Sequence, residues 1–229
     1  MHQLKSVGLL LTALAILIFR ADAATVIWSA SQDNGFSAAD ASMVPAGNLL
    51  RVGSFNISDQ QIVENQSNIA FLNSNFTEFG SARFGQGVGG PGYFTATSAA
   101  NPDASGLNVA GKQIYVWAFL SGDNSSNAQS LATVVQHGIF YIPFSADPQW
   151  AFPTDVPLPG DTTIDISDLT QPDAATLDAL AKILVGSFPT GPNGALNSQN
   201  FALVVPEPSS ACLLVLSAIG FLGSRRRAR

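Results

Sequence analysis

Few residues in this chain of 229 have side chains that could do chemistry. The histidines are His2 and His137 and the one cysteine is Cys212, too few for a zinc site built from several His or Cys ligands. A serine triad would have to use His137, and no Gly-x-Ser-x-Gly sequence is present to supply the nucleophile. We predict a structural or surface role for His137, and no catalytic, cofactor-binding or metal-binding residue.

Paired carboxylates are the remaining route to catalysis. A glycosidase places two of them beside a sugar, and the glutamates before Glu207 are Glu64 and Glu78. Aspartates can serve as well, but no pair has a selective spacing. A secreted hydrolase that acts on polysaccharide therefore stays open as an alternative to a protein without catalytic activity.

Two polar stretches offer oxygen ligands for Ca²⁺. One is Gly122–Asn127, and the other contains Asp161, Asp165 and Asp168. Neither has the alternating acids, central Gly and terminal Glu of an EF-hand loop. Ordinary turn chemistry explains both stretches, so we predict no calcium site from them.

The charge of the central segment narrows the choice of partners. Residues Ala24 to Val205 contain four Lys and Arg against fourteen Asp and Glu, a net charge of −10, and no cysteine. Such a surface repels phosphate backbones, so we expect no nucleic acid partner. Without cysteine the segment has no disulfide, and its stability must come from packing.

The elements that must position these residues are mostly strands. Runs of β-branched and aromatic residues alternate with turn-rich stretches, which is typical of a sandwich. We predict a mainly β, antiparallel sandwich-like single domain with two short helices and with residues 112–119 as a central strand. The predicted strands are Thr25–Trp28, Leu49–Phe55, Tyr93–Thr97, Gln113–Leu120, Gly138–Phe144, Thr162–Ile166 and Phe201–Val205.

Helix signals occur in two places. Ser58 and Gln61 have the spacing of a capping box, and Ile62, Ile69 and Leu72 follow at helical spacing. The second signal runs from Pro172 to a stop at Gly186, with leucines 177, 180 and 184 on one face. We also predict that the three tryptophans belong to the core: Trp28, Trp117 and Trp150. If they were exposed instead, their flat aromatic faces would suit the binding of a sugar.

The N-terminus reads as a secretory signal peptide covering residues 1–23. Basic residues precede an apolar stretch from Val7 to Phe19, and Ala21-Asp22-Ala23 is an A-x-A cleavage site. Cleavage there makes Ala24 the first residue of the exported chain. The domain organisation is then the signal peptide, a domain at 24–205 and a tail at 206–229.

The tail has three parts in a fixed order. Pro206, Glu207 and Pro208 hold the backbone extended. Residues 209–223 are then predicted to form a short transmembrane helix, about 20 Å long against a hydrocarbon core of about 30 Å. A basic end follows and keeps the C-terminus on the cytoplasmic side; it consists of Arg225, Arg226, Arg227 and Arg229.

These 24 residues resemble the PEP-CTERM sorting domain of Gram-negative bacteria. The resemblance implies an exosortase-type membrane enzyme that acts near Pro206 to Pro208, and a host that makes exopolysaccharide. It implies a protein exported through the inner membrane, held there for a time by its tail, and then found at the cell surface or in the extracellular matrix. A permanent, uncut anchor is the alternative. Short segments such as Gly35-Phe36-Ser37 also resemble PEP-CTERM proteins of verrucomicrobial type.

Overall fold

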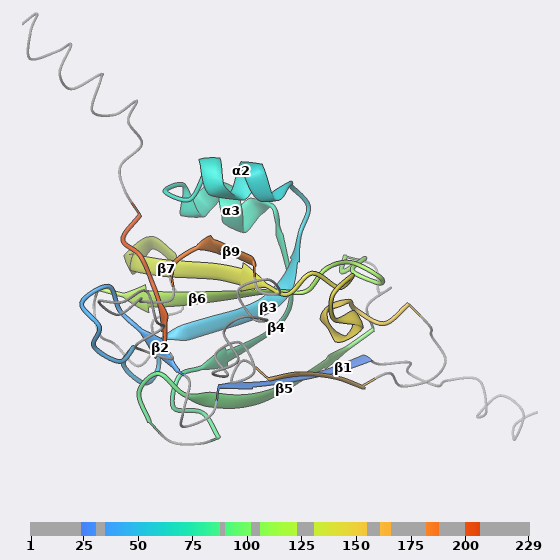
Figure 1. The fold of residues 1–229 in the computed structure, drawn as a ribbon, viewed down its shortest axis with the longest axis horizontal. Coiled ribbons are helices and arrows are strands. Elements are labelled where there is room, and N and C mark those ends of the chain that lie inside the picture. Colours follow the sequence, from blue (N-terminus) through green and yellow to red (C-terminus); the bar gives the residue numbers. More distant parts are fainter. Residues whose placement is uncertain are drawn as a thin grey trace, which may run out of the picture.

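The domain is built in three layers around a five-stranded antiparallel sheet (Figure 1). The computed structural model describes residues 24–30, 35–87, 90–101, 106–122, 131–154, 161–165, 182–187 and 200–206. The central sheet has the strand order β4-β3-β6-β7-β9. The three-stranded sheet β5-β1-β8 lies below it, and the short helices α2 and α3 lie above it. The predicted mainly β, sandwich-like fold with two short helices is confirmed.

The elements have the following bounds. The strands are β1 Ala24–Ala30, β2 Phe36–Ser37, β3 Leu49–Phe55, β4 Phe76–Arg83, β5 Phe94–Ala100, β6 Tyr115–Ser121, β7 Val134–Tyr141, β8 Asp161–Asp165, β9 Lys182–Val185 and β10 Phe201–Ala202. The helices are α2 Asp59–Glu64 and α3 Ile69–Ser74, with short 3-10 turns η1 Leu131–Thr133 and η2 Pro148–Trp150.

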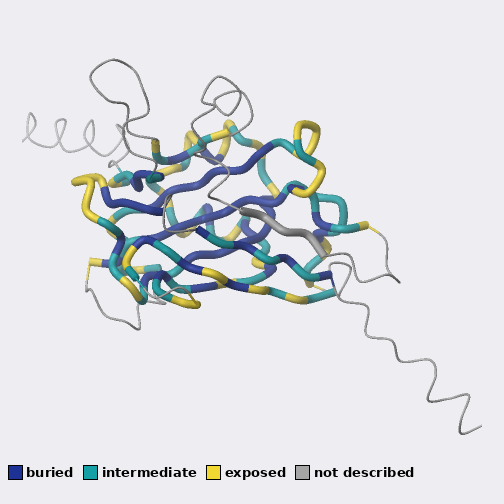
Figure 2. Tube along the Cα trace, turned by 60° about the horizontal axis from the view of Figure 1, so that its bottom comes forward, coloured by how far each residue is buried: buried dark blue, intermediate teal, exposed yellow. Residues whose placement is uncertain are grey.

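The core lies on both faces of the central sheet. Because side chains alternate along a strand, β3 sends Leu50 and Val52 toward the three-stranded sheet and Arg51 and Phe55 toward the helices. β6 pairs with β3 on one side and β7 on the other, and is buried on both faces as predicted for a central strand (Figure 2). The three tryptophans are buried at 2% exposure or less, which confirms their assignment to the core.

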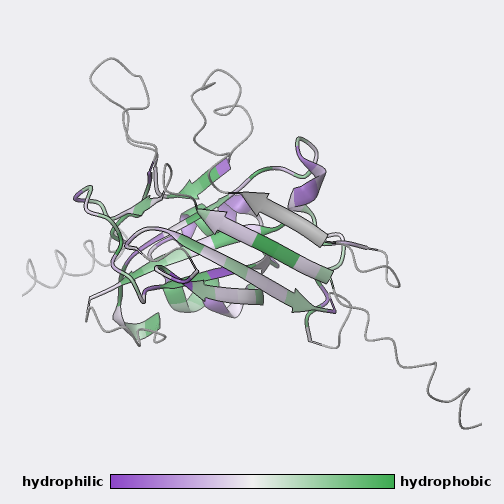
Figure 3. Cartoon of the chain, turned by 90° about the horizontal axis from the view of Figure 1, so that it is seen from below, coloured by the Kyte–Doolittle hydropathy of each residue, from purple (hydrophilic) through white to green (hydrophobic). Residues whose placement is uncertain are grey.

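Side chains on the outer face of strands β1 and β5 are mostly small or polar, with the half-buried Ile27 as the exception. Seen from below in Figure 3, strands β1 and β5 are mostly pale, with intermediate hydropathy, apart from a hydrophobic green band in β1. Thr95 and Thr97 are exposed there, and Thr25 and Ser29 are half-buried. The opposite side chains of the same strands, Trp28 and Phe94 among them, are fully buried. This alternation is typical of a sheet with one wet face.

Two strand pairs are parallel and join distant parts of the chain. β1 pairs in parallel with β8, and β2 pairs in parallel with β10. Beyond β10, Val204 exchanges two backbone hydrogen bonds of 3.0 Å with His137 of β7. The segment that leads into the predicted sorting tail is therefore part of the fold as far as Val204.

The first predicted helix forms as two. Ser58 caps α2: its hydroxyl oxygen accepts from the Gln61 backbone N–H, and its own backbone N–H donates to the Gln61 side-chain oxygen. The predicted capping box is therefore present. The helix ends at Asn65, whose side-chain amide donates to the Gln61 carbonyl, and Asn68 caps a new helix, α3. Asparagine competes with helical hydrogen bonding in this way. Ile62 and Leu72 are nonetheless fully buried, and Ile69 is partly buried.

The second predicted helix is wrong where the structure describes it. Residues 182–185 form strand β9, paired antiparallel with the edge of β7. Pairing of Ile183 and Val185 with an open sheet edge outweighs a helical pattern of leucines. Residues 172–181 of that prediction lie outside the described residues. β7 itself begins at Val134 and ends at Tyr141, earlier than the predicted Gly138–Phe144.

Candidate functional site

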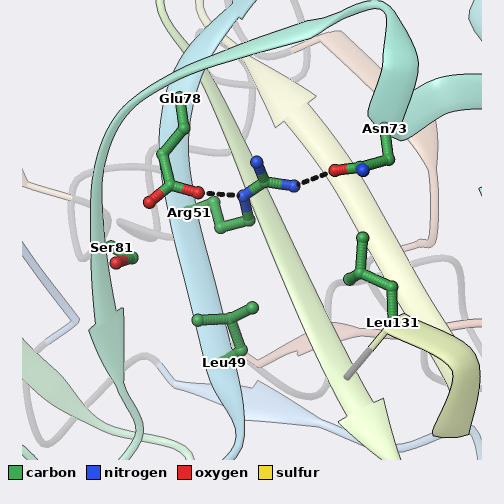
Figure 4. Close-up of a pocket in the computed structure, with 6 residues that line it drawn as sticks. All are labelled: Leu49, Arg51, Asn73, Glu78, Ser81 and Leu131. Carbon is green, nitrogen blue, oxygen red and sulfur yellow. Dashed lines mark hydrogen bonds and ion pairs between the residues drawn. The ribbon is translucent and has the colours of Figure 1, made fainter. Parts of the chain in front are cut away.

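A pocket of ≈ 280 Å³ opens beside the first residues of β3, between the central sheet and α3 (Figure 4). Four of its residues come from β3 and β4, one from α3 and one from the 3-10 turn before β7. The lining residues are Leu49, Arg51, Asn73, Glu78, Ser81 and Leu131. The pocket thus combines four polar side chains with two leucines.

A β-bulge in β4 places two of the polar residues on one face. Glu78 and Ser81 are three positions apart, so in a regular strand they would face opposite ways. The register between β3 and β4 shifts at Val52/Gly53, which leaves Phe79 as an extra residue. Phe79 packs on Phe152. Both Glu78 and Ser81 then lie on the side of the sheet that carries Arg51, as a bulge re-aims side chains.

Arg51 is the organising side chain of the pocket. It is only 9% exposed, and its Nε forms a hydrogen-bonded ion pair with Glu78 Oε2. Its Nη1 donates to Asn73 Oδ1 at 2.6 Å. A buried charge needs such partners, and here they come from β4 and α3.

Two aromatic rings hold the guanidinium from the sheet side. The Arg51 Cζ atom lies 4.8 Å from the centre of the Phe76 ring and 5.6 Å from that of Trp117, within the range of cation–π attraction. Phe76 can lie this close to the strand because its neighbour there is Gly53, where an added Cβ would meet the Phe76 ring at 2.6 Å. The guanidinium is therefore fixed on several sides before any ligand arrives.

The lining of the pocket offers several groups that could contact a ligand and one acidic side chain. The bonds to Glu78 and Asn73 use two of the five N–H donors of Arg51. Glu78 is the one carboxylate in the lining, and it already neutralises Arg51. Of the glutamates considered for a glycosidase, Glu64 lies instead on α2, where it accepts from Gln60 at 2.8 Å. The structure does not bring the two glutamates together in this pocket.

His137 is buried in the sheet away from this pocket lining. Its Nδ1 accepts from Trp117 Nε1 at 3.1 Å, and its Nε2 lies 2.8 Å from the Gln66 carbonyl oxygen. A carbonyl can only accept, so Nε2 carries the proton and the ring is neutral. Burial lowers the pKa of His137 to about 4, although the Gln66 carbonyl acts the other way. The buried imidazole thus links the sheet to the helices through its two hydrogen bonds, one to Trp117 and one to Gln66.

Asp59 is the second polar tie between these layers. Its carboxylate accepts from the Tyr115 hydroxyl at 3.1 Å and the Tyr141 hydroxyl at 2.5 Å. Lys182 Nζ of β9 completes the cluster at 3.0 Å. Burial raises the pKa of Asp59, but the bonds from the two tyrosines and the lysine outweigh it and leave the pKa below the usual value. Burial also raises the pKa of both tyrosines above the usual 10.

Most residues predicted for sorting and processing lie outside the described residues. Ala24 is the first residue of β1 and Pro206 is the last described residue. The stretch Asp123–Asn127 and Asp168 are also outside, while Asp161 and Asp165 belong to β8. In the part of the chain that is described, no three His, Cys, Asp or Glu side chains could share a metal ion. Predicted residues outside it are Ala21, Ala23, Glu207, Pro208, Arg225, Arg226, Arg227 and Arg229.

No helix among the described residues has the length and apolarity to cross a membrane. The apolar segment predicted to do so, residues 209–223, is not among them.

Comparison with protein-family models, with curated proteins and with solved structures finds no match to this chain.

Sequence reasoning missed the pairing of Arg51 with Glu78. A signal was present, because Arg51 is the one charged residue in the strand Leu49–Phe55. A charge inside an apolar strand needs a partner, and the pocket is built around that partner.

Proposed function

We propose that this chain is an exported surface or extracellular-matrix protein without catalytic activity, which associates with exopolysaccharide after an exosortase-type enzyme has processed its tail. The observation that carries the polysaccharide association is the pocket at Arg51, where polar side chains converge beside two leucines. Sites for small ligands combine apolar contact with a few placed polar groups. The sorting step is supported by the order of Pro206-Glu207-Pro208, apolar segment and arginines.

A secreted hydrolase of polysaccharide is the alternative. Hydrolysis with two carboxylates needs a second acid beside Glu78, and the residues that line the pocket contain one carboxylate. That carboxylate is already engaged in an ion pair with Arg51. The arrangement therefore supports binding more than cleavage.

The sorting step is tested by the mass of the protein recovered from cells and from the surrounding matrix. We expect a chain that begins at Ala24 and ends near Pro206 in the matrix. Replacement of Pro206, Glu207 and Pro208 by alanine should leave the tail uncut, and removal of residues 225–227 should impair retention at the membrane. A matrix protein that still ends at Arg229, or an alanine variant processed like the parent, would overturn the assignment.

The polysaccharide association is tested separately. The purified full chain, in a detergent without a sugar headgroup, is passed over immobilised polysaccharide from the producing cells. We expect retention of the chain and no release of reducing ends. Flow-through without retention would contradict the association, and release of reducing ends would favour the hydrolase.

A further inference from the structure

We propose that the pocket at Arg51 and Glu78 takes an uncharged hexopyranose unit of a polysaccharide and rejects the corresponding uronic acid. This inference rests on the proposed association with polysaccharide and adds the class of sugar. It follows from the charge, the hydrogen-bonding groups and the size of the pocket.

The charge of the pocket disfavours an anion. Arg51 would attract a carboxylate, but Glu78 already forms an ion pair with it. The Glu78 side chain is 39% exposed, so an acidic ligand that approached Arg51 would meet this carboxylate at close range. Like charges at such a site cost affinity. The net charge of −10 between Ala24 and Val205 adds a repulsion of longer range against acidic polymers.

The hydrogen-bonding groups suit hydroxyls. A sugar hydroxyl both donates and accepts, so it is best bound where a donor and an acceptor lie side by side. Arg51 has three N–H donors beyond its bonds to Glu78 and Asn73, and the Asn73 amide nitrogen is a further donor. Glu78 offers acceptor oxygens and Ser81 a hydroxyl that can do either. Adjacent hydroxyls of one ring can bridge Arg51 and Glu78.

The donors are held before a ligand arrives. Phe76 and Trp117 hold the guanidinium from the sheet side, and Asn73 fixes it from α3. A binding group that is already ordered loses little conformational entropy on binding. This matters for sugars, because each hydroxyl must exchange water for a protein partner at small net gain.

The size of the pocket indicates one sugar unit at a time. Its volume of ≈ 280 Å³ lies just under the range of roughly 300–1,000 Å³ common for small-molecule sites. Leu49 and Leu131 provide apolar surface for the C–H groups of a ring. We therefore expect the pocket to hold one residue of a polymer whose neighbours extend outside it.

The test compares each neutral oligosaccharide with its uronate counterpart, which differs only by a carboxylate at C6. The panel contains glucose, galactose and mannose oligomers, and the protein is the full chain in a detergent without a sugar headgroup. We expect at least one neutral oligomer to bind about tenfold or more tightly than its uronate. Glu78→Gln keeps an acceptor for Arg51 and removes the negative charge, so it should lower this ratio about tenfold and make uronate binding salt-sensitive.

A second variant tests the location. Ser81→Phe, at an exposed position of the edge strand β4, should fill the pocket and abolish binding of both sugars. Thr97→Phe, at an exposed position of β5, is the matched control and should leave binding unchanged. Circular dichroism checks that each variant folds.

The outcomes separate this inference from the proposed function. A parent protein that prefers the uronate, and loses it in Ser81→Phe, would overturn the choice of sugar and leave the association with polysaccharide standing. A parent protein that binds no sugar of this panel would overturn this inference, while the association would still be decided by retention on the polysaccharide from the producing cells. Equal binding by Ser81→Phe and Thr97→Phe would overturn this site while the association stands.

Discussion

Trp117 donates its indole N–H to Nδ1 of His137, at 3.1 Å in the interior of the domain. The other ring nitrogen faces the Gln66 carbonyl, between α2 and α3. If Nδ1 were protonated, its N–H would face the N–H of Trp117, and neither group could accept a hydrogen bond from the other. The imidazole is therefore a neutral link between the sheet and the helices.

Acid should destabilise the domain through His137. Its pKa is about 4 in the folded protein, against 6.5 for a free histidine side chain, so between these values the unfolded chain gains a proton that the folded chain does not. The contribution of His137 to the free energy of unfolding is fully present above pH 6.5. It decreases by about 3 kcal/mol as the pH falls to 4. Urea unfolding at pH 7 and at pH 4.5 measures it.

His137→Asn provides the control for this pH dependence. Its unfolding free energy should be lower at pH 7 and should change less between pH 7 and 4.5 than that of the parent. Equal slopes in the two proteins would show that other groups cause the acid sensitivity. Asp59 acts at lower pH, because its folded pKa lies below 3.8.

Loss of the Asp59 charge should loosen α2 from the sheet. Asp59→Asn weakens the bonds from Tyr115, Tyr141 and Lys182, and we expect a cost of about 1–3 kcal/mol in unfolding free energy. Glu64→Gln, on the exposed side of the same helix, should cost less than about 0.5 kcal/mol. Similar losses in both variants, measured by urea unfolding, would refute the role of the cluster.

Replacement of Arg51 by lysine should destabilise the fold although the charge is kept. Lysine has no planar fork to reach both Glu78 and Asn73, and we expect a loss of about 1–3 kcal/mol in thermal or urea unfolding. Lys112→Arg, an exchange at a partly exposed position, should change stability by less than about 0.5 kcal/mol. An Arg51→Lys variant as stable as the parent would mean that charge alone matters there.

A methyl group at Gly138 should displace the C-terminal strand. An added Cβ would meet Phe201 Cε1 at 2.3 Å and Leu203 Cδ2 at 2.9 Å. Gly138→Ala should therefore cost about 1–3 kcal/mol through overpacking, and amide exchange of Val204 should become faster. At Gly122 an added Cβ would meet the exposed side chain of Val135 at 2.8 Å and the Thr133 carbonyl oxygen at an ordinary 3.7 Å, so Gly122→Ala should cost less. Unchanged exchange in Gly138→Ala would contradict this packing.

The strands that sequence predicted well have simple side-chain patterns. β3 is Leu49–Phe55 in both prediction and structure, and β6 is an apolar run in the centre of the sheet. The Ser58 capping box is visible in sequence because capping uses neighbouring residues only. Such local patterns can be recognised in the sequence without knowing which strand or helix each element packs against.

β4 and β9 were not predictable in this way, for two reasons. The burial of β4 repeats every three residues, because the bulge at Phe79 interrupts the alternation. β9 is short, and it is a strand because the edge of β7 lies beside it. The pocket could not be predicted for the first of these reasons. The bulge that interrupts the alternating pattern of β4 also turns Glu78 and Ser81 toward Arg51.

The parallel pairs of β1 with β8 and of β2 with β10 constrain the order in which the strands can pair as the chain emerges. β3 with β4 and β6 with β7 are neighbours in sequence and can pair early, whereas β2 has to wait for residues 201–202. Until then the edge of β7 that receives β9 and Val204 is open to other chains. Those last residues are followed directly by Pro206-Glu207-Pro208. On the proposed route of export and sorting, the domain would complete its fold only as the proposed sorting tail emerges, and a partly exported chain would need protection until then.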